Sequence, residues 1–354
     1  MRIIKPITIT DSTLTSTNVL DVAPDLYDSG VTYSKGDFVH IVNGTALDIY
    51  ESLYDSNLNN DPATTEWWIY RSSTYPEYLS SETYALGDVV IRTSDHKKYE
   101  SLQDSNTGND LDTATTYWIE AGATNAWTAF DKKIGSQTLR TGEVKYVIAP
   151  GGIIEKIAFF NMDCSSISIS ISDPTDGLVF EQEIKMISTS NVYDAYSYCF
   201  APFLTIKNTV SLDTPPYSNP VISITINGGS DIDEVGVGTI VLGKTSYIGE
   251  TQYSPTIEII DYSIKDPDDY GNIDVVERAF SRRISVDIYV ENSLVGFILD
   301  ELETYRATPV AWVTTEASVA LQNPYLIYGF YKGFSTVAEY ISHSLESIEI
   351  ESLV

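Results

Sequence analysis

The chain has 354 residues, of which 43% are hydrophobic and 20% are charged, a balance typical of a folded globular protein and too apolar for disorder. Its formal net charge of −29 argues against a nucleic-acid binder and against adsorption to an anionic membrane, because both need cationic surfaces. We therefore expect its partners to be other proteins, neutral glycans or cations. Two cysteines are too few for a disulfide framework.

The N-terminal segment, residues 1–24, opens MRIIKPITIT and lacks the apolar core of a signal peptide. No stretch of the chain approaches the ~20 apolar residues needed to cross a bilayer. These features predict a protein that is made in the cytoplasm and stays soluble there. The run at 3–9 is a candidate strand of the C-terminal domain, in which case the modules that follow are a long insertion.

Two segments, 32–70 and 83–120, are similar in sequence and indicate a duplication. Gly-Asp turns before strand-like runs predict one small antiparallel β module per copy, at 25–72 and 75–122. Such a small unit needs aromatic residues for its core. The ordered matches pair Tyr33 with Tyr84, Gly36-Asp37 with Gly87-Asp88, Tyr50-Glu51-Ser52-Leu53 with Tyr99-Glu100-Ser101-Leu102, Asp55-Ser56-Asn57 with Asp104-Ser105-Asn106, Asn60-Asp61 with Asn109-Asp110, and Trp68-Ile69 with Trp118-Ile119.

Both copies resemble the type-3 chitin-binding modules of chitinases and phage tail proteins, which read roughly W…T-x-Y-x-x-G-D-x-V…G-x-x-Y…N…P…W. The matching residues are Tyr33, Gly36, Asp37, Val39, Gly44, Tyr50, Asn57, Pro62 and Trp68, then Tyr84, Gly87, Asp88, Val90, Tyr99, Asn106 and Trp118. The predicted module core is Tyr33, Tyr50, Trp68, Tyr84, Tyr99 and Trp118.

This sequence departs from the chitin-binding pattern in two ways. Tyr27 and Tyr78 replace the leading Trp, and Ser-Leu replaces the aromatic pair that often follows the middle Tyr. Sugars bind by stacking on exposed aromatic faces, so the remaining candidates for glycan binding are Tyr54, Trp67, Tyr70 and Tyr117. The alternative is that the modules act only as spacers or docking units.

The middle of the chain, residues 123–248, predicts a β-sandwich of jelly-roll type. Residues 123–135 are typical of a connector. The runs 167–172 and 221–226 alternate between apolar and polar residues, as half-buried strands do, and 173–177 is a Pro/Gly turn. The segment 237–243 is similar to the last strand of galactose-binding-like jelly rolls.

The C-terminal segment, residues 249–354, predicts an α+β domain with one helix. Residues 284–290 alternate as a strand, 293–306 carry apolar residues at helical spacing, and strands are expected at 309–313, 325–330 and 345–353. The whole chain is thus expected to be mainly β. The stretches 278–283, 306–309 and 328–331 resemble parts of phage tail-tip and distal-tail proteins.

The titratable residues nominate no catalytic group. His40, His96 and His343 form no metal-ligand motif and are expected to be polar surface or half-buried residues. Asp266, Asp268, Gly271 and Glu277 stand at positions 1, 3, 6 and 12 of a calcium loop, but no helix precedes them, and an acidic turn is the alternative. We expect no cofactor.

Together these features predict a non-enzymatic structural protein of a bacteriophage tail tip or baseplate, made in the host cytoplasm and carried in the virion. It would form a homo-oligomeric ring, contact other tail proteins and present its modules to a host-surface glycan, with no nucleic acid bound and no membrane insertion. The alternatives are a secreted carbohydrate-binding accessory protein of a chitinase-type system and a polysaccharide depolymerase.

Overall fold

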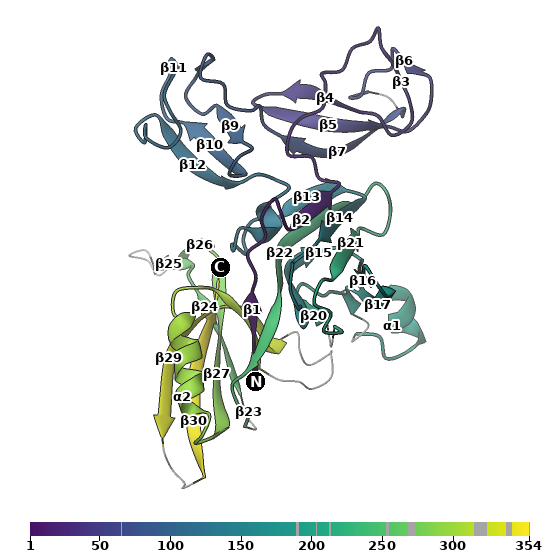
Figure 1. Ribbon diagram of the computed structural model, residues 1–354. Coiled ribbons are helices and arrows are strands. Elements are labelled where there is room, and N and C mark those ends of the chain that lie inside the picture. The colour runs from purple at the N-terminus through teal and green to yellow at the C-terminus, as the bar shows by residue number, and fades with distance from the viewer. Residues whose placement is uncertain are drawn as a thin grey trace.

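The computed structural model describes residues 1–64, 66–188, 191–202, 204–211, 214–252, 255–267, 273–314, 324–337 and 342–353. The described chain is mainly β, as the sequence predicted, with helices α1 (Ala195–Phe200) and α2 (Val295–Thr304) and a 3-10 turn at Thr128–Phe130. Figure 1 shows the two modules at one end of the molecule, the sandwich below them and the C-terminal strands at the other end.

The duplication in sequence is a duplication of fold. Each module has a three-stranded antiparallel sheet, in the order β4-β5-β7 or β9-β10-β12, and one short two-stranded ladder, β3 with β6 or β8 with β11. The strands are β3 (Thr32–Tyr33), β4 (Phe38–Asn43), β5 (Ala46–Ser52), β6 (Asn57–Leu58) and β7 (Trp68–Thr74), then β8 (Thr83–Tyr84), β9 (Val89–Arg92), β10 (Lys97–Ser101), β11 (Asn106–Thr107) and β12 (Trp118–Ala123).

The first sheet of the sandwich has five strands in the order β17-β16-β21-β14-β2. The isoleucines at alternate positions of 167–171 and 222–226 are all buried, so the alternation predicted both strands correctly. They pack against the other sheet through β15 and β22. The five strands are β2 (Leu14–Thr17), β14 (Glu143–Ile148), β16 (Ser166–Asp173), β17 (Gly177–Lys185) and β21 (Val221–Asn227).

The second sheet has eleven strands and runs through the sandwich into the C-terminal region. Its order is β20-β15-β22-β1-β28-β29-β30-β27-β23, with β13 beside β22 and β24 beside β27. The strands are β1 (Arg2–Pro6), β13 (Thr138–Thr141), β15 (Lys156–Asp163), β20 (Thr209–Ser211), β22 (Glu234–Tyr247), β23 (Glu250–Thr251), β24 (Thr256–Asp261), β27 (Phe280–Glu291), β28 (Val310–Val313), β29 (Leu326–Val337) and β30 (His343–Ser352).

The first strand, β1, joins the two halves of this sheet. It pairs antiparallel with β22 on one side and with β28 on the other, so that Ile3 lies opposite both Ser246 and Trp312. Ile3 packs in the C-terminal core, whereas Ile4 packs in a second cluster with Phe160 on the other face. The frame formed by the sandwich and the C-terminal strands is therefore continuous through its N-terminal strand.

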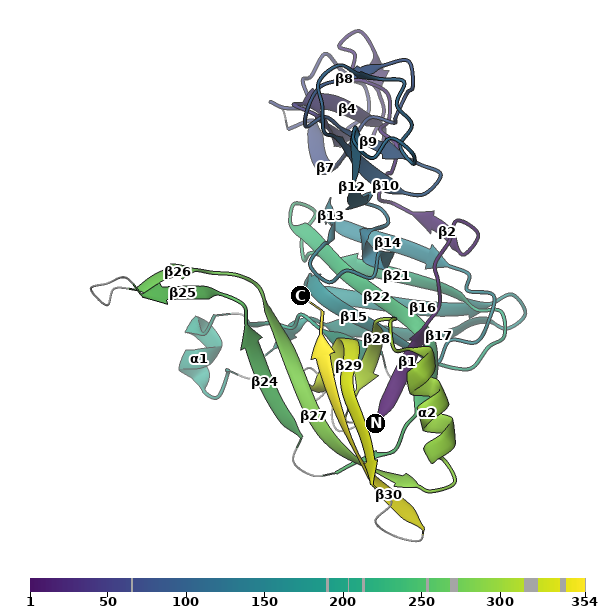
Figure 2. The same ribbon diagram turned by 90° about the vertical axis from the view of Figure 1, so that its left-hand side faces the viewer.

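Helix α2 covers the C-terminal part of the large sheet. Ile298 and Leu302, one turn apart, are buried in one core with alternate residues of β27 and with Trp312. The predicted helix at 293–306 is thus two residues longer at each end than the observed one. A separate hairpin of β25 (Ile264–Pro267) and β26 (Ile273–Val276) projects beyond β24 and β27 (Figure 2).

Two segments differ from their expected roles. Residues 123–135 are more than a connector, because Ala126 and Ala129 are buried in the sandwich core and Trp127 and Phe130 pack against it. Between residues 187 and 205, the short strands β18 (Ile187–Ser188) and β19 (Leu204–Thr205) pair, and α1 follows an Asp194 cap. Neither feature was predicted from the sequence.

A buried carboxyl in β30 yields a prediction about stability and pH. Glu346 is fully buried, and its Oε2 has no hydrogen-bond partner among the described residues, while Oε1 accepts from Thr336 at 3.3 Å. Burial raises the pKa of Glu346 above its ordinary value. Because the folded-state pKa is raised, this group's contribution to stability is fully present below the unfolded pKa and is lost as pH rises through the folded pKa.

We therefore expect Glu346→Gln to raise the free energy of unfolding at neutral pH by about 1 kcal/mol, because the uncharged amide avoids the cost of ionising a buried carboxyl. The gain should shrink as the pH falls toward the acidic range. Urea unfolding at a series of pH values measures it, with the exposed Glu303→Gln as control. A variant less stable than wild type at neutral pH would contradict the prediction.

Candidate glycan-binding site

Module 1 is built around three aromatic rings. Tyr27 lies 5.9 Å from Tyr33, stacked, and 5.9 Å from Trp68, edge-on, while Tyr33 and Trp68 lie 5.1 Å apart, all as centroid distances. Trp68 is 5% exposed, and its indole N–H donates to the carbonyl of Asn60 at 2.9 Å. Tyr27 therefore fills a core position, where the chitin-binding pattern has its leading Trp.

Module 2 repeats this arrangement closely. Tyr78, Tyr84 and Trp118 stand at centroid distances of 6.0, 5.7 and 5.2 Å, and the Trp118 indole donates to the carbonyl of Asn109 at 3.0 Å. Burial raises the pKa of Tyr78 and of Tyr84. These rings are thus committed to the core of the module.

The repeated polar residues hold each module together. In module 1, Asn57 donates to Ser52 Oγ at 2.9 Å, and Asn60 donates to Asn57 Oδ1 at 2.8 Å. The Asp37 carboxylate accepts from the backbone N–H of residue 34 at 2.7 Å, and Asp55 accepts from that of residue 35 at 3.0 Å. The same four bonds recur in module 2, at 2.9, 2.8, 2.7 and 3.0 Å. The duplicated positions are therefore structural.

The two middle tyrosines of the repeats differ in surroundings. Tyr99 is buried, accepts from Arg92 at 2.7 Å and donates to Asp95 at 2.7 Å. Tyr50 is only half-buried and stands edge-on to Tyr70 at 5.7 Å. Tyr50, which was predicted to lie in the module core, is thus only partly in it, and its ring contacts Tyr70, one of the glycan-binding candidates.

One pair of predicted glycan-binding residues meets at the surface of module 1. Tyr54 is 52% exposed, and its ring stands edge-on to that of the half-buried Trp67 at 5.1 Å and 67°. Tyr54 follows β5 and Trp67 precedes β7, and the backbone N–H of Leu53 donates to the Trp67 carbonyl at 2.9 Å. This hydrogen bond between the two loops holds the Tyr54–Trp67 pair.

Module 2 lacks this pair. Gln103 stands at the position of Tyr54, and its side-chain amide donates to the carbonyl of Thr116 at 2.9 Å. Tyr117 stands at the position of Trp67 and packs against the module core. The structure therefore brings together Tyr54 and Trp67 in module 1, whereas the corresponding neighbour of Tyr117 in module 2 is Gln103.

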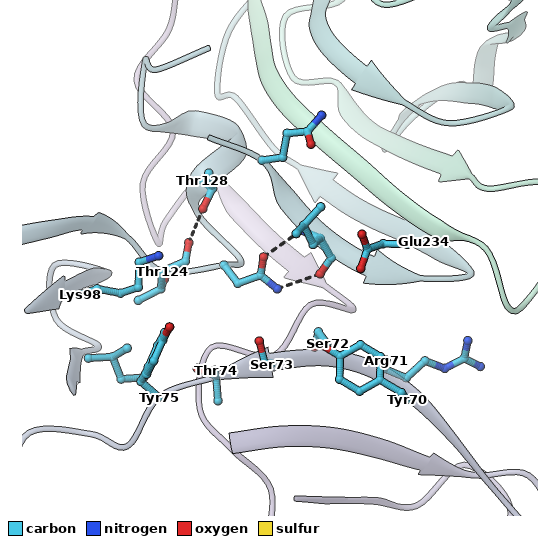
Figure 3. A pocket seen from close by; sticks show the side chains of 14 residues that line it. Tyr70, Arg71, Ser72, Ser73, Thr74, Tyr75, Lys98, Thr124, Thr128 and Glu234 are labelled. Atoms are coloured by element: carbon cyan, nitrogen blue, oxygen red, sulfur yellow. Dashed lines mark hydrogen bonds between the residues drawn. The ribbon is translucent and has the colours of Figure 1, made fainter. Parts of the chain in front are cut away.

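Tyr70 lies at a different place, the junction of module 1 with the rest of the chain. It lines a cavity of about 190 Å³ between β7, module 2 and the sandwich (Figure 3). Beside it, Arg71 pairs with Glu51 at 2.7 Å and donates to the carbonyl of Thr141 at 3.1 Å, which ties module 1 to the sandwich. Burial raises the pKa of Tyr70. Tyr70 thus belongs to the junction of module and sandwich.

A larger cavity, of about 500 Å³, lies between module 2 and the sandwich. His96 lies at its edge, with its ring stacked on Trp127 at a centroid distance of 3.9 Å. Its Nδ1 lies 2.8 Å from Asp21 Oδ2, and its Nε2 lies 2.7 Å from Asp11 Oδ1. The sequence did not reveal this role, because both carboxylates are more than 70 residues away along the chain.

Among the residues that the structure describes, the other candidates form no common site. His40 Nδ1 lies 2.6 Å from the carbonyl of residue 24, and His343 stacks near Tyr289. Of the calcium-loop residues, Asp266 lies on β25 opposite Asp274, Glu277 follows β26, and Asp268 and Gly271 lie outside the described residues. Within the described ranges, no three His, Cys, Asp or Glu side chains gather in a way that could hold a metal ion.

Comparison with known proteins adds no relative. No protein-family model matches the chain, and no curated protein or solved structure matches it. Among the described residues, no helix has both the length and the apolar character needed to cross a membrane.

Proposed function

We propose that this chain is a structural attachment protein of the phage tail-tip type, in which a rigid β frame presents two modules and module 1 holds a neutral surface glycan on the Tyr54–Trp67 pair. The observation that carries the proposal is that the exposed Tyr54 and the half-buried Trp67 meet edge-on at the surface, whereas Tyr27, Tyr33 and Trp68 pack together in the module core. The resemblance of the modules to chitin-binding modules supports the same ligand class.

The chemistry is non-covalent stacking. The C–H faces of a pyranose ring pack on aromatic faces, and two rings at 67° present two such faces to neighbouring units of one chain. A neutral glycan fits better than an acidic one, because a chain of net charge −29 repels polyanions. Two rings form only a small contact, so single-site affinity should be weak and attachment should depend on many copies.

The frame supports this role mechanically. Strand β1 bridges the two halves of the eleven-stranded sheet, and Arg71 and His96 fasten one module each to the sandwich. The modules are therefore held at one end of the molecule rather than loosely tethered (Figure 1). In a tail tip, the rest of the frame would contact neighbouring proteins.

The test compares binding of wild type, Trp67→Ala and Tyr117→Ala to immobilised host polysaccharides and chitin. We expect Trp67→Ala to weaken binding about tenfold, the order expected for losing one stacking ring, and Tyr117→Ala to leave it unchanged. If wild type is not retained on any polysaccharide, or if both variants lose equally, the proposal is wrong. Release of reducing ends from the polysaccharide would favour a depolymerase instead.

A further inference from the structure

The described residues between β18 and β19 leave the sandwich and return without adding to its core. Met186 before it is buried, and Ile206 after it packs against the same core. In between, β18 pairs with β19, and the side-chain amide of Asn191 donates to the carbonyl of Pro202 at 2.7 Å. Hydrogen bonds within this segment therefore hold its two ends together.

Helix α1, within this excursion, also has a defined start. The Asp194 carboxylate accepts from the backbone N–H of Ser197 at 2.7 Å, and the Ser197 hydroxyl accepts from the backbone N–H of Asp194 at 2.9 Å. This reciprocal capping box fixes the first turn of the helix. Its side chains are therefore displayed in a set arrangement.

What α1 displays is aromatic and exposed. Tyr193, Tyr196, Tyr198 and Phe200, here called the α1 patch, are 82%, 73%, 79% and 70% exposed, and no residue of α1 is buried. Tyr196 and Phe200 pack on each other at 4.8 Å, which keeps their outer faces together. A helix in a soluble protein normally buries one apolar face, so a helix that buries none and exposes three aromatic rings, with the exposed Tyr193 just before it, indicates an interaction surface.

The size of the α1 patch fits a protein contact. Aromatic side chains bury roughly 150–250 Å² each, so four rings at this exposure offer roughly 600 Å². A stable protein–protein contact covers about 800 Å² on each partner, and its centre is enriched in Tyr and Phe. The patch lies at the margin of the molecule in both views, where another chain can reach it (Figures 1 and 2).

The charge distribution indicates which partner fits. Residues 191–202 carry a single charge, Asp194, on a chain of net charge −29. Two copies of this chain repel each other over most of their surfaces, and the repulsion is smallest where both present an uncharged patch. A basic partner gains little here, because the carboxylates that would attract it lie elsewhere.

We propose that the α1 patch is the contact through which two copies of this chain associate, face to face about a two-fold axis. An isologous contact of this kind needs only one self-complementary surface, and stacked aromatic rings supply one. This inference shares one idea with the proposed function, namely that copies of the chain assemble with each other. It does not depend on glycan binding by module 1.

The experiment is sedimentation of the purified full chain, without polysaccharide, over a range of protein and salt concentrations. We expect wild type to self-associate and salt to strengthen the association, because it screens like charges. The double variant Tyr196→Ser/Phe200→Ser should raise the dissociation constant about 30-fold, as the loss of central aromatic anchors does. Its thermal unfolding should match that of wild type, because neither side chain is buried.

The control variant is Val275→Ser/Val276→Ser, which removes exposed apolar residues from the β25–β26 hairpin and should associate like wild type. The two thiols give a second readout. Cys199 is exposed beside the α1 patch, whereas Cys164 is buried, and burial raises its pKa to about 12. Raising the protein concentration should protect Cys199 of wild type, but not of the double variant, from alkylation.

Three results would overturn the proposal. The first is wild type that stays monomeric throughout, which would refute self-association. The second is a double variant that associates like wild type, which would place the contact outside the α1 patch. The third is association that salt weakens, which would indicate a contact between opposite charges. If the double variant were monomeric like wild type but lost polysaccharide binding, the α1 patch would be a glycan surface instead. Failure of the Trp67→Ala test with intact self-association would refute only the glycan proposal.

Discussion

Replacing Trp68 with alanine is expected to unfold module 1, whereas the same change at the adjacent Trp67 should leave it folded. Trp68 is 5% exposed, packs on Tyr27 and Tyr33, and donates its indole N–H to Asn60. Truncating a buried Trp costs about 3–5 kcal/mol, which is comparable with the stability of a unit this small. Trp67 loses mainly its edge-on contact with Tyr54.

Amide hydrogen exchange measures this difference strand by strand. In Trp68→Ala, the amides of β4, β5 and β7 should lose protection, while those of the frame keep it. Trp118→Ala should have the same effect on β9, β10 and β12. Full protection of module 1 in Trp68→Ala would show that Trp68 is not needed for its fold. Loss of protection in Trp67→Ala would show that Trp67 is needed for it.

The second large effect is expected at the junction of module 2 with the frame. His96→Ala removes both contacts to Asp21 and Asp11 and the stacking on Trp127. Asp21 is mostly buried, and its Oδ1 already lacks a partner among the described residues, so its carboxylate would lose the partner of its other oxygen. Breaking a largely buried pair in this way costs about 2–3 kcal/mol.

His96 lies outside the core cluster of module 2, so the variant should release a folded module rather than unfold it. Limited proteolysis should then cut between residues 120 and 128 faster than in wild type. Asp11→Asn is the control, because the Asp11 side chain is 73% exposed and an exposed pair contributes less than about 1 kcal/mol. Equal cleavage of His96→Ala and wild type would contradict the assigned role of this histidine.

The sequence predicts those parts of the fold that follow from local periodicity. The alternating isoleucines of β16 and β21 and the helical spacing of Ile298 and Leu302 each report one buried face, and the structure has these elements. The pairing of β1 with both β22 and β28 has no local signal, because its partners lie more than 230 residues away. The sequence indicated a strand at 3–9 that could join the C-terminal domain, but it did not indicate the pairing with β22.

The candidate site shows the same limit. The repeat identified which residues matter to both modules, and the structure shows that Asn57, Asn60 and Trp68 matter because they hold the fold. Among the four aromatic candidates, periodicity could not separate Tyr54 and Trp67 from Tyr70, which faces the junction. The difference between the copies was the usable signal, since Gln103 replaces Tyr54 in module 2.

The exposure of the aromatic residues of α1 could not be predicted from the sequence for a related reason. The run from Tyr193 to Phe200 is rich in aromatic residues, which as a composition suggests burial rather than display. Its capping residues Asp194 and Ser197 do mark a helix start, but exposure of the helix depends on where the chain leaves the sandwich. That is a property of the tertiary fold.

The decisive experiment is a titration of the labelled protein with soluble oligosaccharides, followed by the indole N–H signals of its five tryptophans. If the Tyr54–Trp67 pair holds the glycan, one signal, assigned to Trp67 by its loss in Trp67→Ala, shifts in a saturable way while those of Trp68 and Trp118 stay in place. Shifts confined to Trp118 or Trp127, or no shift with an oligosaccharide that the protein retains on a column, would refute binding at this pair.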